Sequence, residues 1–192
     1  MPDHGAMKTL EVILQRELAG LRERSGKKAL DVLEVGTIRE TAEGARPADG
    51  WSTLFFAEHV AEHGGRVVGV DLDVSAARLV LQRHGVAEKV ELVTGSSLEV
   101  LPRLVDEGAS FDVIFLDSDN DPDLVMSEYE FALKLIRPGG LILADDVDQD
   151  DVWVRKGLKL IPYLKDSGVA FRIDRREASW GGRDVMIQEV KG

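Results

Sequence analysis

The sequence predicts an α/β fold in which helices cover both faces of a doubly wound, mostly parallel sheet of seven strands. Short apolar segments alternate with segments whose apolar residues recur at helical spacing, as in strand–helix–strand units. The last two apolar segments, residues 169–174 and 184–190, have no helical pattern between them. We therefore expect a C-terminal hairpin that adds an antiparallel strand to the sheet.

The other expected strands are apolar runs, most of which end in an acidic or small polar residue. They cover residues 30–35, 66–70, 89–94, 111–116 and 141–144. The expected helices carry apolar residues three and four positions apart. They cover residues 7–24, 51–63, 75–84, 97–106, 121–136 and 152–165. This alternation is typical of a Rossmann-like sheet, in which ligands bind beyond the carboxyl ends of the strands.

Length and composition fit one globular domain, residues 1–192, with residues 1–28 as a helical extension. The chain contains no cysteine, which excludes a disulfide framework, a cysteine-based zinc site and a thiol nucleophile. No apolar run approaches the roughly 20 residues of a membrane span, and the first residues lack the pattern of a signal peptide. We expect a cytoplasmic protein with no membrane partner.

The charge distribution argues against nucleic acid as a partner, because the formal net charge is −11 at pH 7. The densest basic pairs, Lys27-Lys28 and Arg175-Arg176, are interpreted as solvated surface. Trp153 could contact a substrate, although aromatic residues in this part of a chain more often pack. The helix at 7–24 and the final hairpin offer contact surfaces for a homodimer.

The carboxyl ends of the strands carry the candidate binding residues. Because parallel strands end at one edge of a sheet, these residues are expected to surround one crevice. They are Gly36, Asp71, the segment from Gly95 to Ser97, Asp117 and Asp145. A carboxylate at position 71 can accept hydrogen bonds from both hydroxyls of a ribose; the alternative is that it caps a helix.

The first strand ends at Gly36, which allows backbone to approach a ligand closely. The segment 37–41 that follows lacks the later glycines of the G-x-G-x-x-G fingerprint, so no pyrophosphate cradle is expected. A ribose site without a pyrophosphate site indicates a nucleoside cofactor such as S-adenosylmethionine. The loop at 37–50 is long for a strand-to-helix connection and is expected to be functional or mobile.

Five segments, in order, carry a family resemblance. They are VLEVG at 32–36, VDLD at 70–73, VTGSSLEVLP at 93–102, FDVIFLD at 111–117 and PGGLILADD at 138–146. Over residues 30–147 the chain resembles the class I S-adenosylmethionine-dependent methyltransferases. It is most similar to the metal-dependent O-methyltransferases of the catechol and caffeoyl-coenzyme A type.

The resemblance implies roles at the methionine end of the cofactor. Glu34 and Gly36 would line that end. Ser52, which follows Gly50 and Trp51 at the start of a helix, would hold the cofactor carboxylate. A helix N-terminus suits this role because its free N–H groups favour an anion.

At the nucleoside end, Asp71 would bind the ribose and Leu72 would lie against the adenine. Gly95, Ser96 and Ser97 would complete the site, with the two serines at the adenine edge. These roles, too, are implied by the resemblance.

The same resemblance implies a divalent metal held by Asp117, Asp145 and Asp146, of which Asp117 and Asp145 would be catalytic. Three carboxylates at neighbouring strand ends repel one another unless a cation or protonation relieves them. Oxygen ligands suit Mg²⁺, and also Ca²⁺ or Mn²⁺. The alternative is that the pair at 145–146 only caps and solvates a loop.

Two positions depart from the family pattern besides the long loop. Asp146 stands where the family has asparagine, and Asn120 stands where it has a lysine near the substrate hydroxyl. Asparagine cannot act as a general base at neutral pH. Proton removal would then fall to the metal, to water or to a carboxylate such as Asp119, Asp121 or Asp148.

The main hypothesis is a methyltransferase that moves the methyl group of S-adenosylmethionine to an oxygen of a small-molecule acceptor. One alternative is a nucleotide-dependent oxidoreductase on a related Rossmann sheet, which the absent glycine fingerprint disfavours. The other is a non-catalytic module that binds S-adenosylmethionine or a protein partner.

Overall fold

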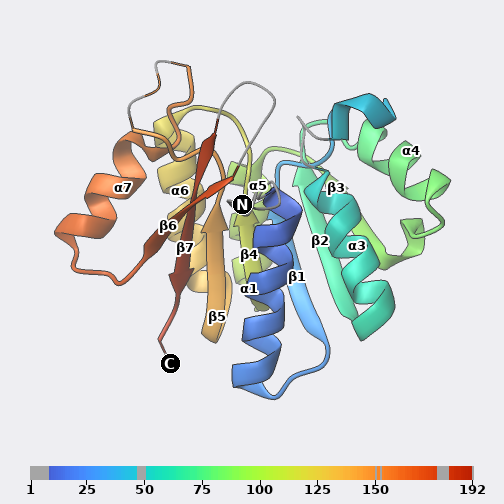
Figure 1. The fold of residues 1–192 in the computed structure, drawn as a ribbon, viewed down its shortest axis with the longest axis horizontal. Coiled ribbons are helices and arrows are strands. Elements are labelled where there is room, and N and C mark those ends of the chain that lie inside the picture. The colour runs from blue at the N-terminus through green and yellow to red at the C-terminus, as the bar shows by residue number, and fades with distance from the viewer. Residues whose placement is uncertain (1–8, 47–50, 150, 152, 177–181, 192) are drawn as a thin grey trace, which may run out of the picture.

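A computed structural model describes residues 9–46, 51–149, 151, 153–176 and 182–191. Its centre is a seven-stranded sheet in the order β3-β2-β1-β4-β5-β7-β6 (Figure 1). The strands are β1 (Leu30–Val35), β2 (Gly65–Asp71), β3 (Val90–Thr94), β4 (Phe111–Leu116), β5 (Ile136–Ala144), β6 (Arg172–Arg176) and β7 (Arg183–Glu189). Strands β1 to β5 are parallel, and β7 runs antiparallel to β5 and β6. The predicted fold class and closing hairpin are confirmed.

Helices cover both faces of this sheet. They are α1 (Leu10–Ser25), α3 (Ser52–His63), α4 (Ser75–Arg83), α5 (Ser97–Asp106), α6 (Pro122–Leu135) and α7 (Gly157–Asp166), with 3-10 turns η1 (Glu43–Ala45) and η2 (Ala87–Lys89). One apolar core joins the sheet to α1, α3 and α4, and the other joins it to α5, α6 and α7. Figure 1 shows α1 and α3 in front of the sheet and α5 and α6 behind it.

Strand β1 lies between β2 and β4, and apolar residues from both cores contact its two faces. Its side chains at Leu30, Val32, Leu33 and Glu34 are fully buried. This explains why the strand reads as a continuous apolar run rather than an alternating one. The direction of strand order reverses between β1 and β4, so the carboxyl end of β1 is the switch point where ligands bind in such sheets.

Two predicted starts differ most from the structure, while others, such as that of β6 at Arg172 instead of residue 169, shift less. Strand β5 begins at Ile136, which pairs with Phe111, and the pairing resumes with a register shift at Leu141. Residues 137–140, which precede the predicted strand, therefore form an irregularity inside β5. Helix α7 begins at Gly157 rather than at residue 152. Just before it, the Asp151 carboxylate accepts hydrogen bonds from the backbone N–H groups of residues 153 and 154, a local alternative to helical pairing.

Local signals in the sequence fix the ends of α1 and the start of α6. The Thr9 hydroxyl accepts a hydrogen bond from Val12 N, and Gly26 ends α1 with a φ of 70°. The Asp121 side chain accepts from Asp123 N, and Pro122 occupies the first turn of α6. Within the described residues, no helix is both long and apolar enough to cross a membrane.

Candidate functional site

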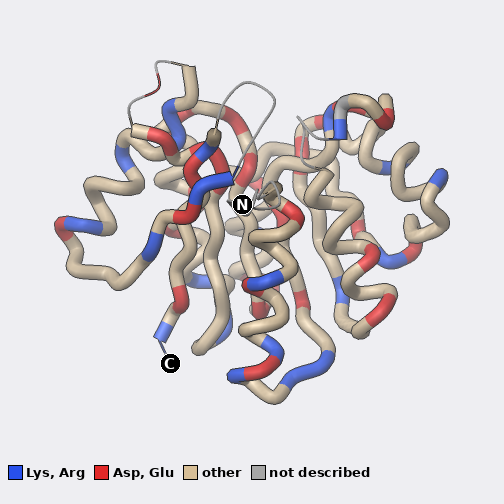
Figure 2. The backbone as a smooth tube through the Cα atoms, in the orientation of Figure 1, with Lys and Arg blue, Asp and Glu red and all other residues tan. Residues whose placement is uncertain are grey.

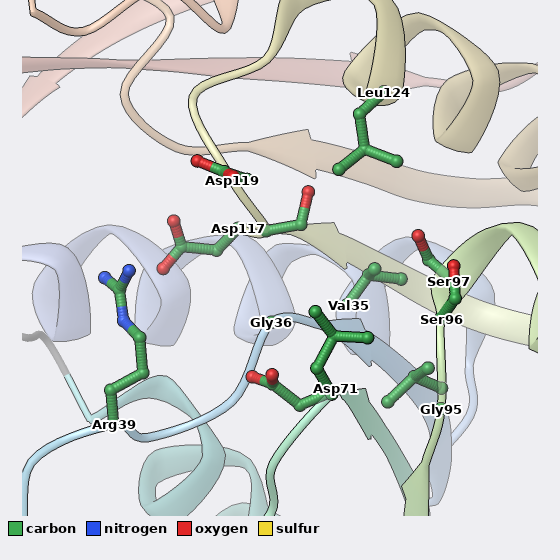
Figure 3. A pocket seen from close by; sticks show the side chains of 13 residues that line it. Val35, Gly36, Arg39, Asp71, Gly95, Ser96, Ser97, Asp117, Asp119 and Leu124 are labelled. Carbon is green, nitrogen blue, oxygen red and sulfur yellow. The ribbon is translucent and has the colours of Figure 1, made fainter.

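A cavity of about 340 Å³ opens at the carboxyl ends of β1 to β4. Its lining includes seven predicted cofactor-binding residues: Gly36, Asp71, Leu72, Gly95, Ser96, Ser97 and Asp117. In Figure 3, the carboxylates of Asp71 and Asp117 lie toward one side of the cavity and the two serines toward the other. The structure thus brings residues far apart in the sequence to one crevice, as parallel strands require.

Gly36, which lines the cavity, allows the backbone after β1 to approach the backbone after β4 closely. Its φ is 89°, and a Cβ at this position would lie 2.2 Å from the backbone oxygen of Asp117. Its backbone N–H donates to Val70 O at 2.9 Å. A side chain would have to displace backbone rather than a flexible group, so the position requires glycine.

Asp71 is held at the cavity by the segment that follows β1. Its Oδ2 accepts hydrogen bonds from Thr37 N at 2.7 Å and Thr37 Oγ1 at 3.2 Å. Among the described residues, its Oδ1 makes one long contact of 3.4 Å with Asp73 N. The N-cap residue of α4 is Val74, without a side-chain cap hydrogen bond, and the Ser75 N–H at the helix start donates to Asp73. The alternative interpretation of Asp71 as a helix cap is therefore wrong.

Glu34 and Ser52 lie outside the cavity lining, buried beside its floor. Neither carboxylate oxygen of Glu34 has a hydrogen-bond partner among the described residues. Burial raises the pKa of Glu34 to about 8, although the hydroxyls of Ser52 and Thr53 lower it and the charges of Asp117 and Asp71 add to the rise. Glu34 is thus a buried carboxyl with the Ser52 and Thr53 hydroxyls near it but no hydrogen bond of good geometry among the described residues, next in sequence to the cavity-lining Val35 and Gly36. Such a group suits a ligand amine or ammonium.

Replacing Glu34 by glutamine is expected to flatten the pH dependence of stability. The folded protein binds this proton up to a pKa of about 8, against an ordinary value of 4.5. The stability due to protonation is present below pH 4.5 and is lost as the pH rises through 8, with a limiting slope of about 1.4 kcal/mol per pH unit. Urea unfolding from pH 4 to 9 measures it. Glu91→Gln, at an exposed position of β3, is the control, and its free energy of unfolding should depend on pH as that of the unmodified protein does. If the pH dependence of Glu34→Gln is the same as that of Glu91→Gln, the assignment to Glu34 is contradicted.

A cluster of carboxylates adjoins the cavity. Oxygens of Asp117, Asp145 and Asp146 lie within 4.8 Å of one another. Asp117 follows β4, and the other two follow β5, its neighbour in the sheet. Asp146 has a φ of 56°, in the left-handed region that asparagine and aspartate tolerate better than most residues. The predicted convergence of these three residues is present in the structure.

Two buried cations, Lys156 and Arg176, contact this cluster, and Arg183 Nε lies 3.9 Å from Asp146 Oδ1. Lys156 Nζ donates to Asp117 Oδ1 at 2.5 Å, and Lys156 is 3% exposed. The Arg176 guanidinium donates to both oxygens of Asp145, at 2.9 and 2.7 Å, and to Asp146 Oδ1 at 3.2 Å. In Figure 2, acidic and basic positions are mixed where β6 ends and β7 begins; Arg176 is the last residue of β6.

A family model described as a methyltransferase domain matches residues 48–147. This chain belongs to that family. A catechol O-methyltransferase of Niastella koreensis is 36% identical over 128 residues, which are 64% of this chain and 52% of that protein. A catechol O-methyltransferase of Mycobacterium tuberculosis is 32% identical over 148 residues, 70% of this chain and 60% of that protein. The chain thus spans about half to three fifths of these relatives.

A solved structure agrees over a wider range. The O-methyltransferase of Bacillus cereus, in complex with SAH, has a TM-score of 0.70 and 27% identity. The match covers 99% of this chain and 84% of the other. The methyltransferase domain described above therefore has the fold of a protein that was solved with the demethylated cofactor bound.

The electrostatics of the methyltransferase domain's cluster depend on burial. Burial raises the pKa of Asp117, with the Asp145 charge adding to the rise and Lys156 opposing it. Burial and the charge of Asp145 raise the pKa of Asp146 to about 7. Burial alone would lower the pKa values of Lys156 and Arg176, but the neighbouring carboxylates outweigh it, so both values rise. The two basic side chains stay positively charged.

Sequence reasoning missed both cations. Arg176 was interpreted as surface, and this is wrong: only Arg175 of the pair is exposed, whereas Arg176 is 5% exposed. A signal existed for Lys156, because it lies four residues before the buried Leu160 and eight before the buried Leu164. A lysine on the apolar face of a helix start needs a partner.

Glu128 was missed as well. It is fully buried in α6 and accepts a hydrogen bond from Ser118 Oγ at 2.6 Å, directly behind the cavity wall. Burial raises its pKa, while the hydroxyls of Ser118 and Ser97 lower it. Its spacing with the buried Val125, Tyr129 and Ala132 places an acid on an apolar helix face, which was a readable signal.

The described part of the long loop, residues 37–46, is tied to neighbouring helices. Arg46 pairs with Glu11 of α1 at 2.8 Å, and Arg83 of α4 donates to Thr41 O at 2.7 Å. Ile38 is buried. The rest of the loop, including Gly50 of the predicted carboxylate-binding turn, lies outside the described residues.

The candidate proton acceptors occupy different settings. Asp119 lines the cavity. Asp121 caps α6. Asp148 accepts from Asp184 N at 3.0 Å and pairs with Arg175 at the hairpin. Trp153 is 82% exposed, so its interpretation as a packing residue is wrong.

Proposed function

We propose that this chain is an S-adenosylmethionine-dependent methyltransferase that transfers a methyl group to an oxygen of a small molecule. The observation that carries the proposal is the cavity at the carboxyl ends of β1 to β4, where Asp71, Gly36 and two serines converge. The family membership and the likeness to a structure in complex with SAH support it. When bound, the cofactor supplies a methyl group activated by attachment to a positively charged sulfur.

The chain's own residues would bind and orient that cofactor. The less occupied Oδ1 of Asp71 would accept from a ribose hydroxyl, while Thr37 holds the other oxygen. Ser96 and Ser97 would face the adenine edge, and Leu72, which is 74% exposed, would cover one face of the ring. Gly36 lets the ends of β1 and β4 lie close together beside the cavity.

The methionine end would lie toward Glu34 and Ser52. The unpartnered carboxyl of Glu34 would accept from the ammonium of the cofactor, directly or through water. Ser52 lies at the first turn of α3, where backbone N–H groups favour a carboxylate. Both residues are buried, so this end of the site excludes bulk water.

The acceptor would lie beside the carboxylate cluster, where Asp117 and Asp145 would help to orient its hydroxyl. Asp119 lines the same cavity and is the carboxylate best placed to receive the hydroxyl proton. Asn120 leaves no lysine at the family's position. A cytoplasmic location and a homodimer stay predictions.

The predicted divalent cation fits the cluster only in part. Its oxygens are the ligands that Mg²⁺ prefers. However, both oxygens of Asp145 already face the Arg176 guanidinium, and Asp117 Oδ1 faces the Lys156 ammonium. The arrangement does not leave the three carboxylates open to one ion, and the proposal assigns no step to a metal.

Isothermal titration calorimetry with S-adenosylmethionine and S-adenosylhomocysteine tests the cofactor site. We expect one equivalent of each to bind. If the pure, folded chain binds neither compound, the proposed function fails. If it binds them but releases no S-adenosylhomocysteine with any of a panel of phenols, catechols and hydroxy acids, the non-catalytic module becomes the better description.

Asp71→Asn is expected to weaken S-adenosylhomocysteine binding about 10- to 100-fold. Hydrogen bonds to a charged group contribute roughly 1.5–3 kcal/mol each, and the neutral amide offers one acceptor oxygen instead of two. Asp73→Asn is the matched control, because that residue is exposed and the oxygen of an asparagine can still accept the hydrogen bond from Ser75 N. Equal affinities for the two variants would remove Asp71 from the ribose site.

A further inference from the structure

The carboxylate cluster beside the cavity is already neutralised by the chain itself. Asp117 has Lys156 at 2.5 Å. Asp145 has both arms of the Arg176 fork, and Asp146 shares one of its nitrogens. A forked, two-bond contact is the strongest pairing that a carboxylate makes with a side chain. Each carboxylate of the cluster therefore has a cationic partner.

Side chains already meet the negative charge of the cluster. Lys156 pairs with Asp117, Arg176 pairs with Asp145 and Asp146, and Arg183 Nε lies 3.9 Å from Asp146 Oδ1. We propose that Lys156 and Arg176 are permanent counter-ions that take the place of a divalent cation, so that this methyltransferase site works without one. The reaction type in this inference rests on the proposed function, whereas the pairing of the cations with the carboxylates does not.

The position of Lys156 is built into the fold. Gly157 follows it at the start of α7, and a Cβ there would lie 2.0 Å from the backbone oxygen of Val147. The helix start therefore packs backbone against backbone next to Asp146. This close approach brings the buried ammonium to Asp117, and any larger residue would move it away.

The position of Arg176 is equally fixed. It is the last residue of β6, in register with Arg183 of β7, and β7 pairs with β5 up to Ala144, directly before Asp145. An ion held by all three carboxylates would have to compete with the Arg176 fork for both oxygens of Asp145 and with Lys156 for Asp117. Leaving one member of a buried ion pair without its partner is strongly destabilising. The geometry therefore disfavours metal entry.

This arrangement changes what the acceptor must offer. A bound divalent ion with open positions can take two adjacent oxygens of one substrate. An ammonium and a guanidinium that are already paired with carboxylates cannot bind two adjacent substrate oxygens as a metal ion does. The site therefore does not require an acceptor with two vicinal hydroxyls, and a single hydroxyl is enough.

Manganese binding tests the proposal, with Mn²⁺ as the probe because its electron paramagnetic resonance signal reports the free ion. The full chain is treated with EDTA, desalted and titrated with Mn²⁺, alone and with S-adenosylhomocysteine. We expect no saturable site below millimolar Mn²⁺. Lys156→Met should bind Mn²⁺ at least 10-fold more tightly, because it opens Asp117. Lys159→Met is the matched control: this lysine lies on the same helix but is exposed and pairs with Asp123.

Two results overturn the proposal. The first is one equivalent of Mn²⁺ bound at micromolar affinity by the unmodified chain and lost in Asp145→Asn/Asp146→Asn. The second is a folded Lys156→Met protein that binds Mn²⁺ no more tightly than the unmodified chain. If this variant does not fold, the titration of the unmodified chain alone decides. Since S-adenosylhomocysteine affinity in EDTA is measured in parallel, failure of the proposed function shows as loss of that affinity instead.

Discussion

Gly36→Ala is expected to weaken S-adenosylhomocysteine binding by about 100-fold or more. A methyl group at this position would lie 2.2 Å from the backbone oxygen of Asp117, and the φ of 89° is strained for any L-residue. Relief requires β1 and the end of β4 to move apart, which displaces both the cofactor site and the carboxylate cluster. A strain of about 3 kcal/mol corresponds to roughly a 100-fold change in affinity.

Calorimetry measures this effect, and circular dichroism verifies that the variant folds. Gly44→Ala is the control within the segment that follows β1, because a Cβ there meets nothing within 4 Å and its φ is not in the left-handed region. We expect that control to keep full affinity. If Gly36→Ala binds within a few-fold of the unmodified chain, backbone proximity at the cavity does not govern cofactor binding.

Arg176→Met is expected to lower the free energy of unfolding by about 3–5 kcal/mol, because it leaves the buried Asp145 carboxylate without its forked partner. Arg175→Met, one residue earlier, is expected to cost no more than about 1 kcal/mol. The Arg175 side chain is 60% exposed and pairs with Asp184 at the surface. Urea unfolding at pH 7 measures both values.

A third variant separates the charge from the packing. In Arg176→Met/Asp145→Asn, the charge that needs compensation is gone, so part of the stability should return. The Arg175 control should show no such coupling with Asp145→Asn. Equal losses for the two arginine variants, or no recovery in the double variant, would contradict the buried-pair assignment.

Much of the fold was readable because local signals and burial agree. Strands β1 and β4 and helix α5 have the predicted bounds, since their apolar runs end at unambiguous polar or glycine residues. Because parallel strands end at the same edge of the sheet, Asp71 and Asp117 come together there regardless of the conformation of the connecting loops. The start of α7 was not readable, because the apolar pattern continues through residues that instead bond to the Asp151 side chain.

The part of the site that sequence reasoning missed has a common cause. Lys156 and Arg176 come from α7 and β6, and neither lies at the carboxyl end of a parallel strand. Their role arises from tertiary contacts across 39 and 31 residues of sequence. Repulsion among three carboxylates signalled that a cation was needed, but it did not distinguish a metal from a side chain.

The pairing of Arg176 with Asp145 also has a consequence during synthesis. The Asp145 carboxylate leaves the ribosome before its counter-ion Arg176, which follows it by 31 residues. At roughly 5–20 residues per second, that interval lasts about 2 to 6 seconds. Until β6 emerges, the nascent sheet carries an unbalanced acidic end that opposes its closure. The last hairpin therefore sets the moment at which the ligand-binding end of the domain can become stable.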